Sequence, residues 1–187
     1  MSAPEARDLR VERERPGGPA SRAFHLTGRF LLRLPALLCV VLVLAWGSLI
    51  WALSARTFAK PAHPSFFFEL LSNLAHAPLF GVLALFLAAL FLRPSVERGW
   101  PRFDVTRAGA VVLLTVLYGA LDEWHQSRTP GRDSSTLDLV TDLVGACAVL
   151  WIVFYLGSER ASEQGLWGRL FLWTLACVAA AALATFD

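Results

Sequence analysis

The sequence predicts an all-α fold, a polytopic bundle of about five transmembrane helices. Apolar residues make up 56% of the 187 residues, and they fall in runs long enough to cross a hydrocarbon core of about 30 Å. Only 17% of the residues are charged, whereas soluble domains average about a quarter. Because the chain is too short to add a second folded domain to such a bundle, we predict one membrane domain over residues 34–187.

The first 33 residues are rich in Arg, Glu, Pro and Gly and offer few side chains for a core. We therefore predict a disordered cytoplasmic N-terminal tail over residues 1–33. Arg22, Arg29 and Arg33 precede the first apolar run and are expected to meet anionic lipid headgroups. That run, Leu34 to Leu53, has no charged residue and exceeds the roughly 7–15 residues of a signal-peptide core, so an uncleaved helix is expected.

Four further spans follow along the chain. The second is predicted around Leu74 to Leu92, with Pro78 in its first turns, where a missing N–H costs least. The third starts near Ala108 and its uncharged part ends at Leu121, while the uncharged part of the fourth runs only from after Asp142 to Ser158. Both of these stretches fall short of the bilayer width. The fifth is predicted from about Leu166 to Phe186.

The distribution of basic residues predicts the orientation. Residues 1–33 and the loop from Arg93 to Arg107 are rich in arginine, whereas the loop from Ser54 to Ser65 and the segment from Asp122 to Ser135 each contain few basic residues. We therefore expect a cytoplasmic N-terminus. Because membrane topology accounts for the arginines, no nucleic-acid binding is predicted.

The segment from Gly119 to Gly145 differs from the rest of the chain, because it holds five of the fifteen acidic residues between the two short spans. Its acids are expected to be drawn to membrane depth, where an unpaired ionisable group costs several kcal/mol. The side chains concerned are Asp122, Glu123, Asp138 and Asp142. Both helix ends lie on the extracytoplasmic side in the predicted topology, and His76 lies there too.

Helical spacing indicates which of these side chains can meet. Asp122 and Gln126 are four residues apart, as are Asp138 and Asp142, so each pair can share one helix face. A Pro-Gly turn precedes Arg132, and the turn allows this arginine to fold back as a bidentate partner for a carboxylate. The segment is therefore predicted to form a polar pocket.

Three other interpretations of these residues stay open. The acids, Gln126 and Arg132 can form a purely structural network that ties two helix ends together. A divalent metal held by His76, His125 and the acids lacks an HExxH motif or tight ligand spacing, so we predict no metal and no other cofactor. The third interpretation is a serine nucleophile, Ser127 or Ser134, paired with His125.

These residues resemble the pattern of the VanZ-like family of bacterial membrane proteins. That family has a His near the outer start of an early helix, then an acid, a Gln, a Pro-Gly-Arg turn, an Asp and a Gly in the next helix. The matching residues are His76, Glu123 with the adjacent Asp122, Gln126, Pro130-Gly131-Arg132, Asp138 and Gly145.

The resemblance extends over about Leu70 to Leu156 and departs from the family at two places. Asp142 stands where many members have Asn, and Ser72-Asn73 replaces an Asp-Lys pair. The resemblance implies a multi-pass protein of the bacterial cytoplasmic (inner) membrane with a role in the cell envelope. The founding member is linked to low-level resistance to teicoplanin, a lipoglycopeptide antibiotic.

Three functions are compatible with the sequence. The favoured one is non-catalytic binding of an envelope ligand or a lipoglycopeptide at the polar pocket, which would contribute to teicoplanin-type resistance. The alternative is a membrane enzyme acting on a lipid-linked or envelope substrate, with Glu123 or Asp122 as general base and Arg132 orienting an anionic group. An ion- or proton-coupled carrier is the third. Membrane lipid is the expected partner, and the oligomeric state stays open.

Overall fold

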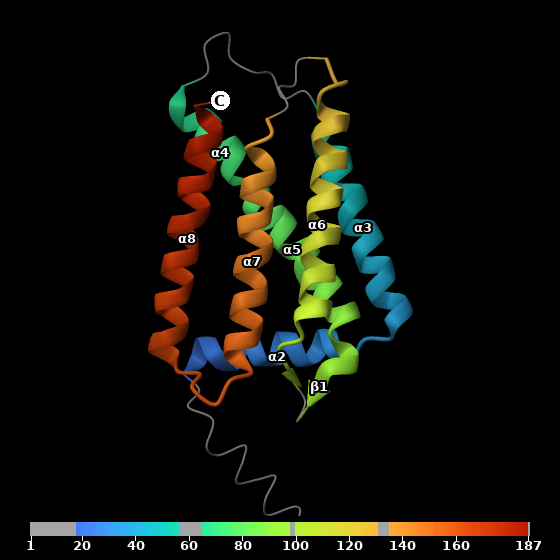
Figure 1. Ribbon diagram of the computed structural model, residues 1–187, viewed down its shortest axis with the longest axis vertical. Helices are drawn as coiled ribbons and strands as arrows, with labels where there is room; N and C mark the ends of the chain where they lie inside the picture. Colours follow the sequence, from blue (N-terminus) through green and yellow to red (C-terminus); the bar gives the residue numbers. More distant parts are fainter. Residues whose placement is uncertain (1–17, 57–64, 98–99, 131–134, 187) are drawn as a thin grey trace, which may run out of the picture.

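The computed structural model describes residues 18–56, 65–97, 100–130 and 135–186, which form a bundle of long helices (Figure 1). Within these residues, five helical segments are long and apolar enough to cross a membrane, which confirms the predicted fold class. They are α3 (Ala36–Ser54), α4 (Phe66–Leu74) together with α5 (His76–Phe91), α6 (Val105–Gln126), α7 (Asp138–Leu156) and α8 (Glu163–Thr185).

Helix α5 lies at the centre of the bundle and packs against α3, α6 and α7, while α8 packs against α7 and α4. Its buried apolar side chains, which include Phe80, Leu83 and Leu87, form the main core. Helices α5 and α7 approach closely, because a Cβ atom added at Gly145 would overlap the backbone carbonyl of Ala77. Small residues permit such close contacts between helices in membranes.

The second span is longer than predicted, because α4 precedes α5 and the two together extend from Phe66 to Phe91. The boundary between them has a physical cause at Pro78. A proline has no N–H, so the carbonyl of Leu74 cannot receive its usual helical hydrogen bond. The break places His76 at the first position of α5, inside the bundle end rather than in a loop.

Helices α6 and α7 both include the acids that were expected at their ends. Helix α6 begins at Val105, where the Asp104 carboxylate accepts hydrogen bonds from the N–H groups of Thr106 and Arg107, and it continues to Gln126. Helix α7 begins at Asp138. Each helix therefore reaches membrane-spanning length only by including carboxylates, as the short apolar runs predicted.

The prediction of a disordered tail is wrong for residues 19–33, which form helix α2 (Pro19–Arg33). Ala23, Leu26 and Phe30 recur at intervals of three and four residues in this stretch, so the segment has an apolar side despite its arginines. Residues 1–17 of the predicted tail lie outside the described residues. In Figure 1, α2 runs crosswise at one end of the bundle, whereas the spanning helices run along its length.

A short connection between α5 and α6 closes the same end of the bundle. It consists of η1 (Arg93–Ser95) and an antiparallel pair of two-residue strands, β1 (Val96–Glu97) and β2 (Trp100–Pro101). Trp100 is buried and donates a hydrogen bond from Nε1 to the carbonyl of Val153 at 2.7 Å. Its ring also packs edge-on against His25 of α2. The connection therefore ties α2 to α7.

Candidate functional site

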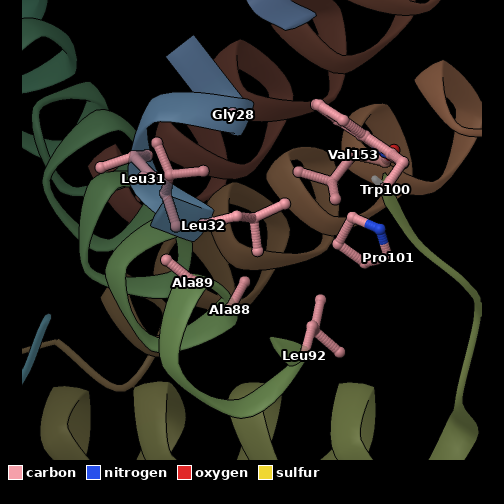
Figure 2. A pocket seen from close by; sticks show the side chains of 10 residues that line it. Gly28, Leu31, Leu32, Ala88, Ala89, Leu92, Trp100, Pro101 and Val153 are labelled. Atoms are coloured by element: carbon pink, nitrogen blue, oxygen red, sulfur yellow. The ribbon is translucent and has the colours of Figure 1, made fainter. Parts of the chain in front are cut away.

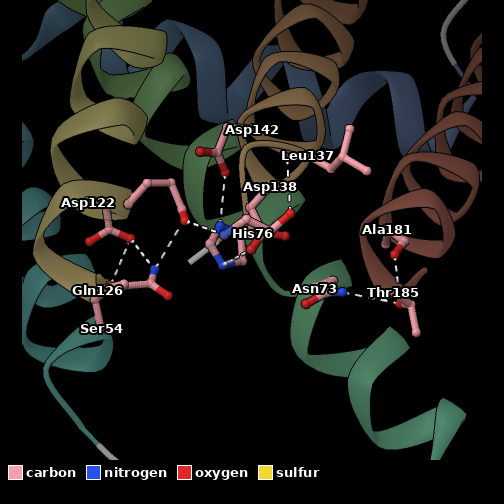
Figure 3. A network of polar contacts seen from close by, with 12 residues as sticks. Ser54, Asn73, His76, Asp122, Gln126, Leu137, Asp138, Asp142, Ala181 and Thr185 are labelled. Atoms are coloured by element: carbon pink, nitrogen blue, oxygen red, sulfur yellow. Dashed lines mark hydrogen bonds and ion pairs between the residues drawn. The ribbon is translucent and has the colours of Figure 1, made fainter. Parts of the chain in front are cut away.

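Polar side chains from four helices converge at the bundle end opposite α2 (Figure 3). We call this group the polar cluster. Its members are Ser54 of α3, His76 of α5, Asp122, Glu123 and Gln126 of α6, and Asp138 and Asp142 of α7. All are buried except His76, whose side chain is 12% exposed. The structure thus brings together every predicted site residue except Arg132, which lies outside the described residues.

His76 occupies the centre of the polar cluster. Its Nδ1 lies 3.1 Å from Asp142 Oδ1, and its Nε2 lies 4.0 Å from Asp138 Oδ2. The imidazole ring also lies parallel to the ring of Phe80, with centroids 5.9 Å apart. A hydrogen bond from Nδ1–H to the fully buried Asp142 would fix both the ring orientation and the tautomer, leaving Nε2 directed at Asp138.

The α6 side of the polar cluster is organised by Gln126. Its Nε2 donates to Asp122 Oδ2 at 2.8 Å, and Glu123 Oε1 lies 3.5 Å away. Asp122 Oδ2 also accepts a hydrogen bond from Ser54 Oγ at 2.8 Å. Glu123 Oε2 accepts from the backbone N–H of Ser135 at 3.0 Å. The predicted four-residue pairing of Asp122 with Gln126 is therefore confirmed.

Glycine makes room for Asp142 between α6 and α7. A Cβ atom added at Gly119 would overlap Asp142 Oδ2, so any side chain at this position would displace the carboxylate. Asp142 has no exposed surface. No charged side chain among the described residues is more deeply buried than Asp142, and it occupies a space that only a glycine at position 119 leaves open.

Within the part of the chain that the structure describes, the polar cluster has more acids than groups that can carry a compensating positive charge. It contains four carboxylates, and His76 is its only member that can carry a positive charge. Asp122 Oδ1 and Asp142 Oδ2 are buried without a hydrogen-bond partner among the described residues. A buried carboxylate that lacks full pairing is costly at membrane depth. The cluster is therefore suited to accept hydrogen-bond donors or a cationic group.

Three of these side chains could together hold a metal ion. One donor atom each from His76, Glu123 and Asp138 lies within 4.8 Å of the other two. Nitrogen and carboxylate ligands of this kind suit a divalent transition metal. The absence of a metal and of any other cofactor was predicted from the lack of a motif, and it stays a prediction.

His125 is directed away from this centre. Its ring stacks on Trp51 of α3, with ring centroids 3.9 Å apart. The donor set that can hold a metal therefore contains His76 rather than His125. The polar cluster does not include His125, which the alternative of a serine nucleophile requires. Of the two candidate serines, Ser127 donates a hydrogen bond to the carbonyl of Trp124 at 2.8 Å. Ser134 lies outside the described residues.

Sequence reasoning did not identify Ser54 as a site residue. It is the last residue of α3 and points at Asp122, although in the sequence it looks like the start of a loop. One feature of the sequence could have identified Ser54: it ends the first apolar run at the membrane side where the acids were predicted to lie. Asn73, in the position of the family's Asp-Lys pair, instead donates to Thr185 of α8 at 3.1 Å, apart from the polar cluster (Figure 3).

An apolar cavity of about 450 Å³ lies between α3, α5 and α6. Trp51, Leu83 and Tyr118 are among its lining residues. The Tyr118 hydroxyl donates to the carbonyl of Gly47 at 2.6 Å. Because Tyr118 precedes Asp122 by one turn of α6, the cavity extends from membrane depth toward the polar cluster.

Comparison with known proteins adds one match. A family model described as VanZ/LLP1 matches residues 37–157. This range contains α5, α6 and α7 and all seven members of the polar cluster, and it leaves α2 and α8 outside. No curated protein and no solved structure matched the chain.

Proposed function

The chain belongs to the VanZ/LLP1 family, as its motif predicted, and from this premise we propose that it binds a cell-envelope ligand at the polar cluster. The observation that carries the proposal is the pair of buried carboxylate oxygens, on Asp122 and Asp142, that lack a hydrogen-bond partner among the described residues. A ligand that brings donors or a cationic group would satisfy these oxygens and relieve the excess of acid.

The neighbouring cavity favours an amphiphilic ligand. Its apolar walls would accept a hydrocarbon chain, while the polar head would lie at His76 and the carboxylates. A lipoglycopeptide of the teicoplanin type joins a polar peptide to an acyl chain and is one such amphiphile. Binding of this kind would contribute to resistance by holding the antibiotic away from its target.

The charges of the two bundle ends support an extracytoplasmic site in a bacterial inner membrane. Among the described residues, the end opposite α2 has only Arg56 and Arg128 as arginine or lysine residues. The end with α2 carries many more. They are Arg22, Arg29, Arg33, Arg93, Arg102, Arg107, Arg160 and Arg169. Basic residues concentrate on the cytoplasmic side of membrane proteins, so the polar cluster would face the periplasm or cell exterior and the N-terminus the cytoplasm.

A second candidate function is catalysis on a lipid-linked or envelope substrate. The pairing of His76 Nδ1 with the buried Asp142 is the observation that favours it, because a carboxylate in this position orients an imidazole for general-base work at Nε2. Asp122 is a weaker candidate for the base than the sequence indicated, since Ser54 and Gln126 both donate to it.

Replacement of Asp142 by asparagine tests the binding proposal. Asp142→Asn preserves the shape of the side chain and an acceptor for His76 but removes one charge from the polar cluster. We expect wild-type protein, expressed in a susceptible bacterium, to lower sensitivity to teicoplanin or another envelope antibiotic severalfold, and Asp142→Asn to lose that effect. Minimal inhibitory concentrations and membrane protein levels are measured together.

Asn73→Ala is the matched control, because it removes a polar contact between α4 and α8 outside the polar cluster. It should behave as wild type. If Asp142→Asn also matched wild type at equal membrane levels, the polar cluster would be a structural network only. The catalytic alternative is tested by comparing the envelope lipids and cell-wall precursors of cells that express wild type with those of cells that express Glu123→Gln or His76→Gln. A change that occurs with wild type and is absent with both variants would favour an enzyme.

A further inference from the structure

Helix α2 has an inner face that is fully occupied by the bundle. Figure 2 shows Leu31 and Leu32 beside Ala88 of α5 and Leu92, the residue after α5, with Trp100 next to Gly28. The cavity left between these residues measures only about 30 Å³, room for little more than a water molecule. The inner face of α2 therefore has its partner already.

Both ends of α2 are also fixed. At its start, the backbone N–H groups of Ala20 and Ser21 donate to the two carboxylate oxygens of Glu163 in α8, at 3.2 and 3.1 Å. At its end, the Arg93 guanidinium donates to the carbonyls of Leu31 and Leu34. These contacts hold the helix across the bundle end, so its direction relative to the spanning helices is set by the fold.

The outer face of α2 is apolar, and no other described segment covers it. Ala23, Leu26 and Phe30 follow one another at intervals of three and four residues, so they share one side of the helix. Leu26 is 69% exposed and Phe30 is 64% exposed. For a helix that crosses the ends of transmembrane helices, this side lies at the depth where headgroups meet acyl chains.

A basic stripe runs beside the outer face. Arg22, Arg29 and Arg33 follow at intervals of seven and four residues, which again places them on one side of the helix. Arginine side chains at this level can hydrogen-bond phosphate oxygens while their stems cover apolar surface. The helix therefore combines an apolar face with an adjoining row of phosphate-binding groups.

We propose that α2 is an interfacial helix that inserts Leu26 and Phe30 among acyl chains and binds anionic phospholipid headgroups through Arg22, Arg29 and Arg33. The match to the family model begins at residue 37, so this surface belongs to a part of the chain that the family does not account for. A second copy of the chain fits the surface poorly, because a two-fold contact would bring the basic stripes together. A membrane leaflet that contains anionic lipids instead offers negative charge to all three arginines of the basic stripe.

The first test measures which lipids the full-length protein retains. Purified protein is equilibrated with equal amounts of phosphatidylglycerol and phosphatidylcholine, and the bound lipids are counted by native mass spectrometry. We expect severalfold enrichment of phosphatidylglycerol, which the triple variant Arg22→Gln, Arg29→Gln, Arg33→Gln reduces by about fivefold or more. The control variant Arg56→Gln, Arg128→Gln at the opposite end should keep the enrichment.

The second test measures the depth of the outer face. Cys39, Cys147 and Cys177 are replaced by alanine, and single cysteines are introduced as Phe30→Cys and Arg33→Cys in nanodiscs containing phosphatidylglycerol. A water-soluble maleimide should label Phe30→Cys at least severalfold more slowly than Arg33→Cys. Equal labelling rates, a crosslink between two chains at Phe30→Cys, or unchanged lipid enrichment in the triple variant would overturn the proposal. None of these results depends on the ligand of the polar cluster.

Discussion

Replacing Gly145 by valine is expected to prevent assembly of the bundle. Even the Cβ atom of the new side chain would overlap the backbone carbonyl of Ala77, and a backbone atom cannot swing aside as a flexible side chain can. Helices α5 and α7 would have to separate along their whole contact, which carries the centre of the core and holds His76 against Asp142. Overpacking of this kind typically costs about 1–3 kcal/mol and more where backbone must move.

The measurement is the yield of monodisperse protein after mild detergent extraction, together with its thermal midpoint. Gly109→Val is the control, since a Cβ added at that position meets no described atom within 4 Å apart from its chain neighbours and the backbone of its own helix. It should extract as wild type, with at most the modest cost of a β-branched residue in a helix. A Gly145→Val protein with wild-type yield and midpoint would contradict the close packing of α5 on α7.

Replacing His76 by alanine is also expected to destabilise the bundle strongly. The change removes the only member of the polar cluster that can offset its carboxylates, and it leaves Asp142 without the contact at 3.1 Å. It also opens a space beside the ring of Phe80. Breaking a buried pair by removing one partner costs about 3–5 kcal/mol.

A double-mutant cycle separates the pairing of His76 with Asp142 from general damage. We expect the double variant His76→Ala, Asp142→Ala to be more stable than the sum of the single effects predicts, by about 1–3 kcal/mol. Reversible unfolding in mixed micelles provides the free energies. Additive effects would mean that the two side chains do not interact.

The number of spanning helices followed directly from the lengths of the apolar runs, because the bilayer sets a minimum length. The convergence of Asp122, Glu123, Asp138 and Asp142 was also predictable, since both α6 and α7 needed their acidic ends to reach that length. Arg132 was predicted to join them, and this stays a prediction because it lies outside the described residues.

Other features depended on contacts that no local pattern contains. Helix α2 was missed because its arginines and the preceding prolines and glycines dominate the composition, whereas its inner face is stabilised by Trp100 and α5. Helix α4 was missed because the second span was predicted to begin only around Leu74. The direction of His125 toward Trp51 depends on the packing of α3 against α6, which the sequence alone does not specify.

The most direct test of the central claim asks which side of the membrane the polar cluster faces. Arg128 lies just beyond α6 at that end, with its guanidinium 3.9 Å from the Trp124 ring centre and open to solvent. On a background without native cysteines, Arg128→Cys should react with a membrane-impermeant maleimide in intact cells, and Arg33→Cys should react only after permeabilisation. The reverse pattern would put the acids and His76 in the cytoplasm and remove the basis for an envelope ligand.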